Sequence, residues 1–156
     1  MTPTRPDTAA DGDRLRSALE RAGLRCTRQR AAVHDYLRSV TCHPTAEQVF
    51  AAVRRRLPHI SLATVYKALE ALVAAGVAAR MSDGPGPARY DGRSEAHYHF
   101  RCARTGQVVD LPLPYDPHLL DKLAPDLAAT LRALGMEVTG HRLEVTGRLT
   151  EAGGAT

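Results

Sequence analysis

Residues 61–91 read SLATVYKALEALVAAGVAARMSDGPGPARYD and indicate what kind of domain begins the chain. Ser61 is a favoured helix N-cap, and Gly76 is a favoured residue just after a helix end. Apolar residues recur between them at helical spacing, namely Val65, Leu69 and Leu72. A strand at 77–81, a turn rich in Gly and Pro, and a second strand ending at Asp91 are predicted to follow. A helix followed by two short strands and a tight turn indicates a winged helix-turn-helix domain.

Three more helices are predicted upstream of this stretch. The first covers residues 14–22, and Thr27 can cap the second. Residues 45–48 (Thr-Ala-Glu-Gln) have the spacing of a capping box, which opens the third helix. We therefore expect a winged-helix DNA-binding domain over residues 14–91, including a hinge. Residues 1–13 are polar, with Pro and Gly among them, and predict a disordered leader.

The second half of the chain has a different pattern, with short strands and one helical stretch interrupted at Pro125. The predicted strands cover 97–102, 107–111, 136–138 and 142–146, and the helical stretch covers 117–134. The fold class is therefore α+β: an N-terminal winged helix-turn-helix domain followed by a small α/β dimerisation domain over residues 92–150, with a tail over 151–156. A sheet this small with one helix leaves an apolar face uncovered, so we expect a homodimer.

Composition limits the class of protein. The 156 residues contain no apolar run near the ~20 residues of a membrane span, and residues 1–13 lack the apolar middle of a signal peptide. We therefore expect a cytoplasmic protein without a membrane partner. Residues 1–80 carry 13 Lys and Arg against 7 Asp and Glu, whereas residues 81–156 carry 8 against 10. A basic first half favours a nucleic-acid partner, with ordinary surface charge as the alternative.

Histidines and carboxylates in the second half have the spacing of a metal site. His97 and His99 alternate along a predicted strand, so they share one face and can reach one ion. Asp91 precedes them and Asp110 follows them, each in a short strand-like run. Nitrogen and oxygen donors without a thiolate suit Fe(II), Mn(II) or Zn(II). If His43 of the first domain joins this set, one ion ties the two domains together and acts as a conformational switch.

The predicted helix at 62–75 is the recognition helix of the winged domain. Its N-terminal half enters the major groove in this kind of fold. There, Tyr66 can contact thymine methyl groups, Thr64 base edges or phosphate, and Lys67 phosphate or guanine. Arg25, in a run of arginines around the start of the second helix, can reach the DNA backbone or the minor groove. A core position is the alternative for Tyr66.

The other histidines and the cysteines are weaker candidates. Three cysteines without a C-x-x-C pair argue against a disulfide framework, although a thiol redox switch stays open. Cys102 is predicted to be a buried apolar residue. His34 is predicted to lie on a helix surface. Four histidines are expected to be structural or exposed, with the last as the strongest exception: His34, His59, His118 and His141.

These segments together resemble the ferric uptake regulator family over about residues 14–149. The matching motifs, in chain order, are GLRCTRQR at 23–30, HPTA at 43–46, SLATVYKAL at 61–69, HYHFRC at 97–102 and VVD at 108–110. The chain is most similar to the peroxide-responsive branch, because Asp110 stands where iron-uptake regulators carry glutamate. The resemblance implies a homodimeric transcriptional repressor, and not an enzyme, that binds an A/T-rich palindromic operator in double-stranded DNA.

The same resemblance implies the chemistry of the site. One regulatory Fe(II) or Mn(II) per subunit, or Zn(II) in purified protein, would have five ligands: His43, Asp91, His97, His99 and Asp110. One coordination place would stay open, where hydrogen peroxide would react with Fe(II), oxidise His43 or His97, and so cause loss of the metal and of DNA. With Mn(II) the site would repress without reacting. Arg25 would lie in the minor groove, while Tyr66 and Lys67 would face the major groove.

The chain departs from the family pattern at the structural zinc. Most members hold it with two C-x-x-C pairs, but here the first place reads Cys-Ala-Arg-Thr from Cys102 and the second reads Leu-Thr-Glu-Ala from Leu149. A structural Cys₄ zinc cannot form, so we expect apolar packing alone to hold the dimerisation domain. Ala96 and Tyr98 likewise offer no ligands for the additional metal site of some members.

Three alternatives stay open from the sequence. A repressor of the same family could report iron, manganese or zinc levels without peroxide chemistry. Two histidines and a carboxylate also support non-haem iron or zinc enzymes, although the sequence indicates no substrate pocket. The third alternative is a thiol-based redox regulator that uses Cys42 or Cys102.

Overall fold

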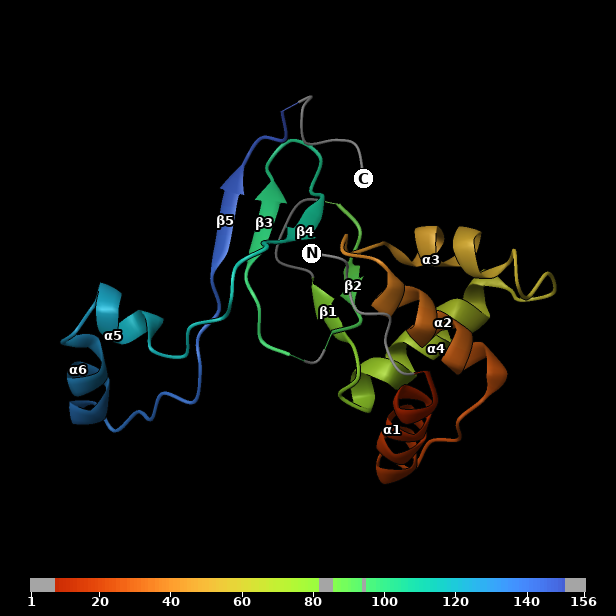
Figure 1. The fold of residues 1–156 in the computed structure, drawn as a ribbon, viewed down its shortest axis with the longest axis horizontal. Helices are drawn as coiled ribbons and strands as arrows, with labels where there is room; N and C mark the ends of the chain where they lie inside the picture. The colour runs from red at the N-terminus through yellow and green to blue at the C-terminus, as the bar shows by residue number, and fades with distance from the viewer. Residues whose placement is uncertain (1–7, 82–85, 94, 151–156) are drawn as a thin grey trace.

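The computed structural model describes residues 8–81, 86–93 and 95–150. Figure 1 shows a helical part with a two-stranded wing, a three-stranded sheet beside the wing, and two short helices at the far end. The N-terminal part contains α1 (Thr8–Arg21), α2 (Arg28–Ser39), α3 (Ala46–Val53), α4 (Leu62–Ala74), β1 (Ala79–Met81) and β2 (Arg89–Asp91). β1 and β2 are antiparallel. The predicted turn between them lies partly outside the described residues. This order is that of the predicted winged helix-turn-helix domain.

Local capping sets where the helices of this part begin. Thr27 and Ser61 each accept a hydrogen bond from the backbone N–H three residues on, at 3.3 Å and 3.1 Å. Thr45 and Gln48 form the predicted capping box, in which the Thr45 N–H donates to Gln48 Oε1 at 2.9 Å. The box fixes the start of α3 directly after His43 and Pro44.

Two predictions for the N-terminal part were wrong. Helix α1 begins at Thr8, so residues 8–13 are not a disordered leader; residues 1–7 lie outside the described part of the chain. Two alanines and Asp11 in the first turn favour the earlier start through helix propensity and the helix dipole. His34 was predicted on a helix surface, but it is 5% exposed and lies on the buried face of α2.

The C-terminal part contains β3 (His99–Cys102), β4 (Val108–Asp110), α5 (Leu119–Leu123), α6 (Leu127–Ala133) and β5 (Glu144–Gly147). The sheet order is β4-β3-β5, with β3 antiparallel to β4 and parallel to β5. The helical stretch is interrupted at Pro125, as predicted. The strand predicted at 136–138 was wrong, because these residues are exposed between Gly135 and Gly140 and pair with no strand among the described residues.

An ion pair lies where apolar packing alone was expected to hold the C-terminal sheet. Arg101 on β3 donates to both carboxylate oxygens of Glu144 on β5, at 2.7 Å and 3.0 Å. The Arg101 side chain is 7% exposed and that of Glu144 is 22% exposed. The expectation of apolar packing alone was therefore wrong: a bidentate pair joins the two parallel strands. Cys102, beside it, is buried as predicted.

Residues 41–45 connect the two parts through backbone hydrogen bonds on both sides. On one side, the His43 N–H donates to the Val108 carbonyl at 3.1 Å, and the Asp110 N–H donates to the Thr41 carbonyl at 3.2 Å. On the other side, the Tyr90 N–H donates to the Pro44 carbonyl at 3.0 Å. The segment therefore lies between β4 of the sheet and β2 of the wing.

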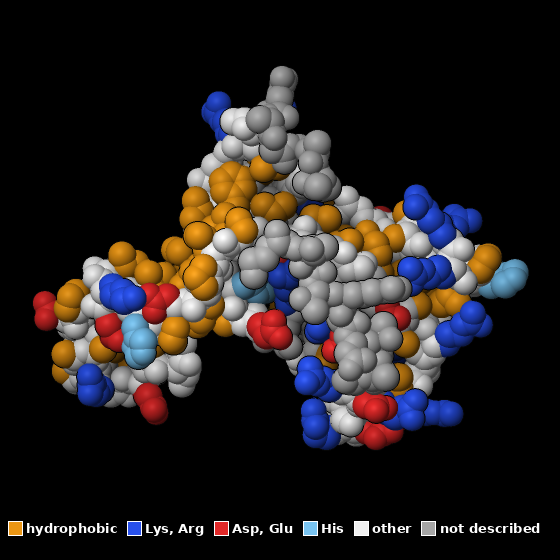
Figure 2. Space-filling model, in the orientation of Figure 1, with side chains coloured by type: hydrophobic (Ala, Val, Ile, Leu, Met, Phe, Trp, Pro, Cys, Tyr) orange, Lys and Arg blue, Asp and Glu red, His pale blue; other side chains and the backbone are white. Residues whose placement is uncertain are grey.

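Apolar side chains are exposed on the C-terminal part, at Leu113, Leu123, Leu134, Met136, Val138 and Val145. Figure 2 shows hydrophobic side chains over this part, and Lys and Arg side chains over the helical part on the opposite side of the view. None of the helices in the described ranges is both long and apolar enough for a membrane crossing. The unequal surfaces follow the charge division of the sequence.

Candidate metal centre

Five side chains from both parts of the fold converge where the wing meets the sheet. His43 precedes the α3 cap, Asp91 ends β2, and His99 begins β3 opposite Asp110 on β4. His97 lies two residues before the start of β3, so the predicted strand is shorter than expected. Its imidazole still faces His99, with the ring centroids 4.4 Å apart. The structure thus brings together all five predicted metal ligands.

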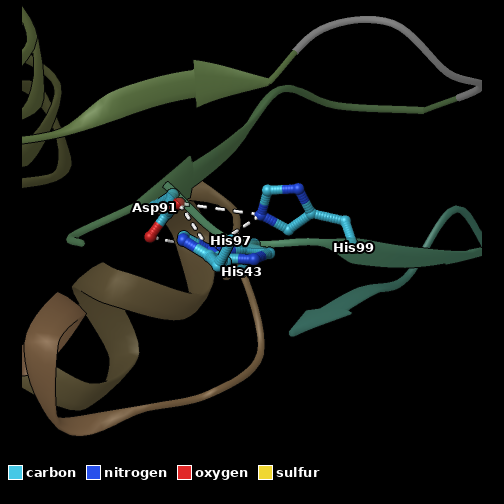
Figure 3. Close-up of side chains that lie close together, drawn as sticks. All are labelled: His43, Asp91, His97 and His99. Carbon is cyan, nitrogen blue, oxygen red and sulfur yellow. Dashed lines mark hydrogen bonds and ion pairs between the residues drawn. The ribbon is translucent and has the colours of Figure 1, made fainter. Parts of the chain in front are cut away.

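The donor atoms of this set lie close to one another, and Figure 3 shows four of the five side chains: His43, Asp91, His97 and His99. The Nε2 atoms of His97 and His99 are 2.9 Å apart, and His97 Nε2 is 3.2 Å from Asp91 Oδ2. Asp110 Oδ1 lies 2.7 Å from His43 Nε2 and 3.1 Å from His97 Nε2. One donor atom from each of four residues falls within a 4.8 Å group: His43, Asp91, His97 and His99. Asp110 adds a fifth donor through its contact with His43.

Several donor atoms of the centre are buried and have no hydrogen-bond partner. Such atoms show whether the centre suits a metal ion, because an ion would satisfy them. His43 Nε2 and Asp110 Oδ1 are buried and lack a hydrogen-bond partner, although they lie 2.7 Å apart. The Nδ1–H of His97 donates to the Glu95 carbonyl at 2.7 Å, so the Nε2 lone pair faces the carboxylates. A lone pair beside anionic oxygens is stabilised by a cation between them. Three imidazoles and two carboxylates therefore fit Fe(II), Mn(II) or Zn(II).

Both carboxylates are ionised at neutral pH despite their burial. Burial tends to raise the pKa of Asp91, but contacts with the histidines and with the Arg93 N–H outweigh it and hold the pKa below its usual value. Burial acts in the same way on the pKa of Asp110, which is lowered by its contact with His43 and by neighbouring positive charge. The centre therefore presents two negative charges to a divalent cation.

Sequence reasoning missed one residue that touches this centre. The Arg93 backbone N–H donates to Asp91 Oδ1 at 2.8 Å, and its Nη1 lies 3.2 Å from Asp110 Oδ2. The i→i+2 bond from an aspartate to the backbone is a common turn, so the spacing of Asp91 and Arg93 was an available signal. The contact with Asp110 had none, because it depends on how the loop folds back over the sheet.

The four predicted DNA contacts lie on the helical part. Arg25, Thr64 and Lys67 line one groove of about 490 Å³ between the α1–α2 turn and α4. Tyr66 is 39% exposed, so the core alternative for it was wrong. Its hydroxyl donates to Glu47 Oε1 on α3 at 2.7 Å. Glu47 was not anticipated, because only the packing of α3 against α4 brings it to Tyr66.

The remaining candidates do not contribute to the group of donor atoms. His141 stacks on Tyr115, with ring centroids 4.8 Å apart and an interplanar angle of 14°, and is therefore structural. Tyr98 accepts a hydrogen bond from the Asp116 N–H at 2.8 Å and packs beside Tyr115. Cys42 is exposed beside His43, whereas Cys102 is buried. No disulfide forms among the described cysteines.

Comparisons with known proteins show which proteins this chain is similar to. The peroxide-responsive repressor PerR of Staphylococcus epidermidis is 33% identical over 131 residues, which are 84% of this chain and 83% of the relative. The ferric uptake regulator of Helicobacter pylori shares the fold, with a TM-score of 0.72 and 19% identity over 97% of this chain and 96% of that chain.

The Pseudomonas aeruginosa ferric uptake regulator, solved with manganese, has a TM-score of 0.64 and 29% identity over 88% of this chain and 98% of that chain. The ferric uptake regulator family model matches residues 21–146. This match covers most of the sequence and includes every residue of the centre and of the predicted DNA contacts. The chain therefore belongs to the ferric uptake regulator family of dimeric, metal-responsive, DNA-binding transcription regulators.

Proposed function

We propose that the protein is a transcriptional repressor that senses hydrogen peroxide through Fe(II) held by His43, Asp91, His97, His99 and Asp110. One observation carries the proposal: His43, from the DNA-binding part, meets donor atoms from the C-terminal sheet inside a single buried group. An ion held there contacts both parts at once. It stabilises the arrangement of the parts in which all its ligands meet, and releases that constraint when it leaves.

The residues of the centre hold the ion and leave one side of it accessible to peroxide. Burial of His43, His99 and both aspartates limits water access, while the His97 side chain is the more exposed of the two proposed oxidation targets, at 14% against 4% for His43. Fe(II) held by these residues would activate the peroxide O–O bond, and the histidine ring would supply the two electrons that reduce the peroxide. In the net reaction, one peroxide oxygen inserts into a ring C–H bond of His43 or His97, and the other leaves as water. The altered ring no longer serves as a ligand, so the metal and the DNA dissociate.

DNA recognition is assigned to the exposed basic surface of the helical part. Tyr66 and Lys67 on α4 face the major groove, Thr64 contacts base edges or phosphate, and Arg25 enters the minor groove of an A/T-rich palindrome. The palindrome matches a homodimer formed through the exposed apolar side chains of the C-terminal part. Both events are proposed to occur in the cytoplasm.

The proposal is tested by operator binding under three metal conditions. Electrophoretic mobility on the A/T-rich palindrome is measured with Mn(II), with Fe(II), and with a chelator. We expect binding to need Mn(II) or Fe(II), and peroxide to release DNA only from the Fe(II) protein. Mass spectrometry of the released protein should find one added oxygen on a peptide that contains His43 or His97. Binding that ignores metal would contradict the proposal.

A second candidate is a repressor of the same family that reports metal levels without peroxide chemistry. The Pseudomonas aeruginosa relative, solved with manganese, is 29% identical and favours a site that takes this ion. Under this reading the Fe(II) protein gains no oxygen after peroxide. The enzyme alternative has less support, because members of the family are transcription regulators and not enzymes. A thiol switch would require loss of the response when Cys42 and Cys102 are replaced by Ser.

A further inference from the structure

We propose that Arg93 is a positioning residue of the metal centre: it holds Asp91 and Asp110 as one-oxygen ligands and limits the affinity of the site for divalent ions. The inference rests on the proposed function, since it assumes that a divalent ion occupies the centre. It concerns how tightly that ion binds and how many donor atoms surround it.

Each of the two aspartates has one oxygen that contacts Arg93, called the outer oxygen here, and one inner oxygen that does not. The outer oxygens contact Arg93: Asp91 Oδ1 accepts from its backbone N–H at 2.8 Å, and Asp110 Oδ2 lies 3.2 Å from its Nη1. The inner oxygens lie nearest the imidazoles, with Asp91 Oδ2 3.2 Å from His97 and Asp110 Oδ1 2.7 Å from His43, whereas the outer Asp91 Oδ1 is farther, 3.7 Å from His43 Nδ1. One residue therefore restrains both aspartates from the same side.

The backbone that carries Arg93 is held in place by close packing. Gly92 is buried against α2, where an added Cβ would lie 2.5 Å from the Cβ of Leu37. Only glycine permits this approach, so the loop after β2 is pressed onto the helix. The Arg93 N–H and guanidinium consequently meet their carboxylates from a fixed backbone position.

This division sets the number of donor atoms available to an ion. A carboxylate that binds with two oxygens must turn both toward the metal, and Arg93 keeps one oxygen of each aspartate turned away. Three histidine nitrogens and two aspartate oxygens then remain, one fewer than the six of an octahedral site. The position left over is the place at which a small molecule reaches the ion.

The charge of Arg93 acts on the same ion. A guanidinium is always protonated, and this one neutralises part of the negative charge of Asp110 and repels a cation beside it. Its side chain is 40% exposed, so water screens the effect to the scale of a surface charge pair. We therefore expect loss of this charge to tighten metal binding by about five-fold.

The test compares Arg93→Gln with wild type and with Arg93→Lys, using Mn(II) and Co(II) alone as probes. Mn(II) affinity is measured by titration calorimetry, and the visible absorption of bound Co(II) reports the coordination number. Arg104→Gln is the matched control, because Arg104 is an exposed arginine in the β3–β4 turn, at the opposite end of β3 from His99. Thermal unfolding checks that each variant is folded.

We expect Arg93→Gln to bind Mn(II) about five-fold more tightly and to weaken the Co(II) absorption, as six-coordination requires, while Arg93→Lys and Arg104→Gln stay near wild type. Unchanged or weaker Mn(II) binding by Arg93→Gln, with normal binding by wild type, would overturn this inference and leave the proposed function standing. Absence of Mn(II) binding by wild type, with no difference from His43→Ala, would overturn both.

Discussion

His34 is a buried titratable side chain that the metal centre does not use. Burial, followed by the charge of Arg38, lowers its pKa from 6.5, while Asp35 and Asp11 oppose the shift. The folded state therefore favours the neutral imidazole. At pH values between the lowered pKa and 6.5, His34 binds a proton more readily in the unfolded chain than in the folded protein. The free energy of unfolding therefore falls as the pH drops through that window.

We expect His34→Gln to flatten this part of the pH dependence. Urea unfolding of metal-free protein is compared at about pH 7.5, above the window, and at about pH 5.5, below the unfolded-state pKa. Wild type should lose more stability on acidification than His34→Gln, whatever the variant costs at the higher pH. His59→Gln, at an exposed position, serves as the control. Equal losses in all three proteins would contradict the assignment.

Glu47 contacts Tyr66, one of the residues proposed to read DNA. Its carboxylate accepts the hydrogen bond of Tyr66, which lowers the pKa of Glu47 and raises that of Tyr66. The bond restrains an otherwise exposed ring on the recognition helix. In the proposed mode of DNA binding, it would also place a negative charge near the phosphates and so disfavour DNA that the ring does not match.

Glu47→Ala is expected to weaken binding to the operator and to strengthen binding to unrelated DNA. Ordering a free tyrosine costs about 0.5–1.5 kcal/mol, so the specificity ratio should fall by about five-fold. Fluorescence anisotropy on operator and scrambled duplexes measures the ratio. Glu70→Ala is the control, because Glu70 is an exposed carboxylate on α4. This variant removes the same charge but keeps the contact of Glu47 with Tyr66. A ratio that falls equally in both variants would assign the effect to charge alone.

At the scale of elements, β3 and β5 are joined by a side-chain pair in a domain that lacks the cysteines for zinc. The Arg101–Glu144 pair is bidentate and mostly buried, so leaving either partner alone is costly. We expect Arg101→Met to lower the free energy of unfolding by about 2 kcal/mol. Chemical denaturation measures this loss.

The exposed pair of Lys122 and Asp116 provides the comparison for that prediction. Its side chains are 66% and 30% exposed, so Lys122→Met should cost less than about 1 kcal/mol. If Arg101→Met cost no more than this exposed variant, the buried pair would not be what holds β5 beside β3.

Elements with local signals were predictable from the sequence, and those that depend on distant partners were not. The start of α3 follows from the capping box of Thr45 and Gln48, whose atoms lie three residues apart. The failed strand at 136–138 had the apolar residues of a strand, but a strand needs a neighbour, and that information lies elsewhere in the chain. Glu47 and the contact of Arg93 with Asp110 were missed for the same reason, since both depend on how the elements pack.

At the scale of the whole molecule, His43 and Asp91 are the two proposed ligands that lie on the DNA-binding part. We expect His43→Ala to fold normally but to lose tight operator binding at modest Mn(II) concentration, because Asp91 is then the one proposed ligand left on the DNA-binding part. Circular dichroism checks the fold, and operator binding is titrated with Mn(II). His118→Ala is the control, since His118 is exposed beside α5. An unchanged Mn(II) requirement in His43→Ala would contradict the link.

The segment at 41–45 is hydrogen-bonded to β4 on one side and to β2 on the other, which fixes its register as well as its position. Along an extended segment, neighbouring side chains point in opposite directions. Deleting or inserting one residue there would turn the imidazole of His43 away from the carboxylates while both domains kept their own cores. Such a protein would be well folded and yet unable to couple metal binding to DNA binding. The chain length between α2 and α3 is therefore as strict a requirement as the identity of the ligand.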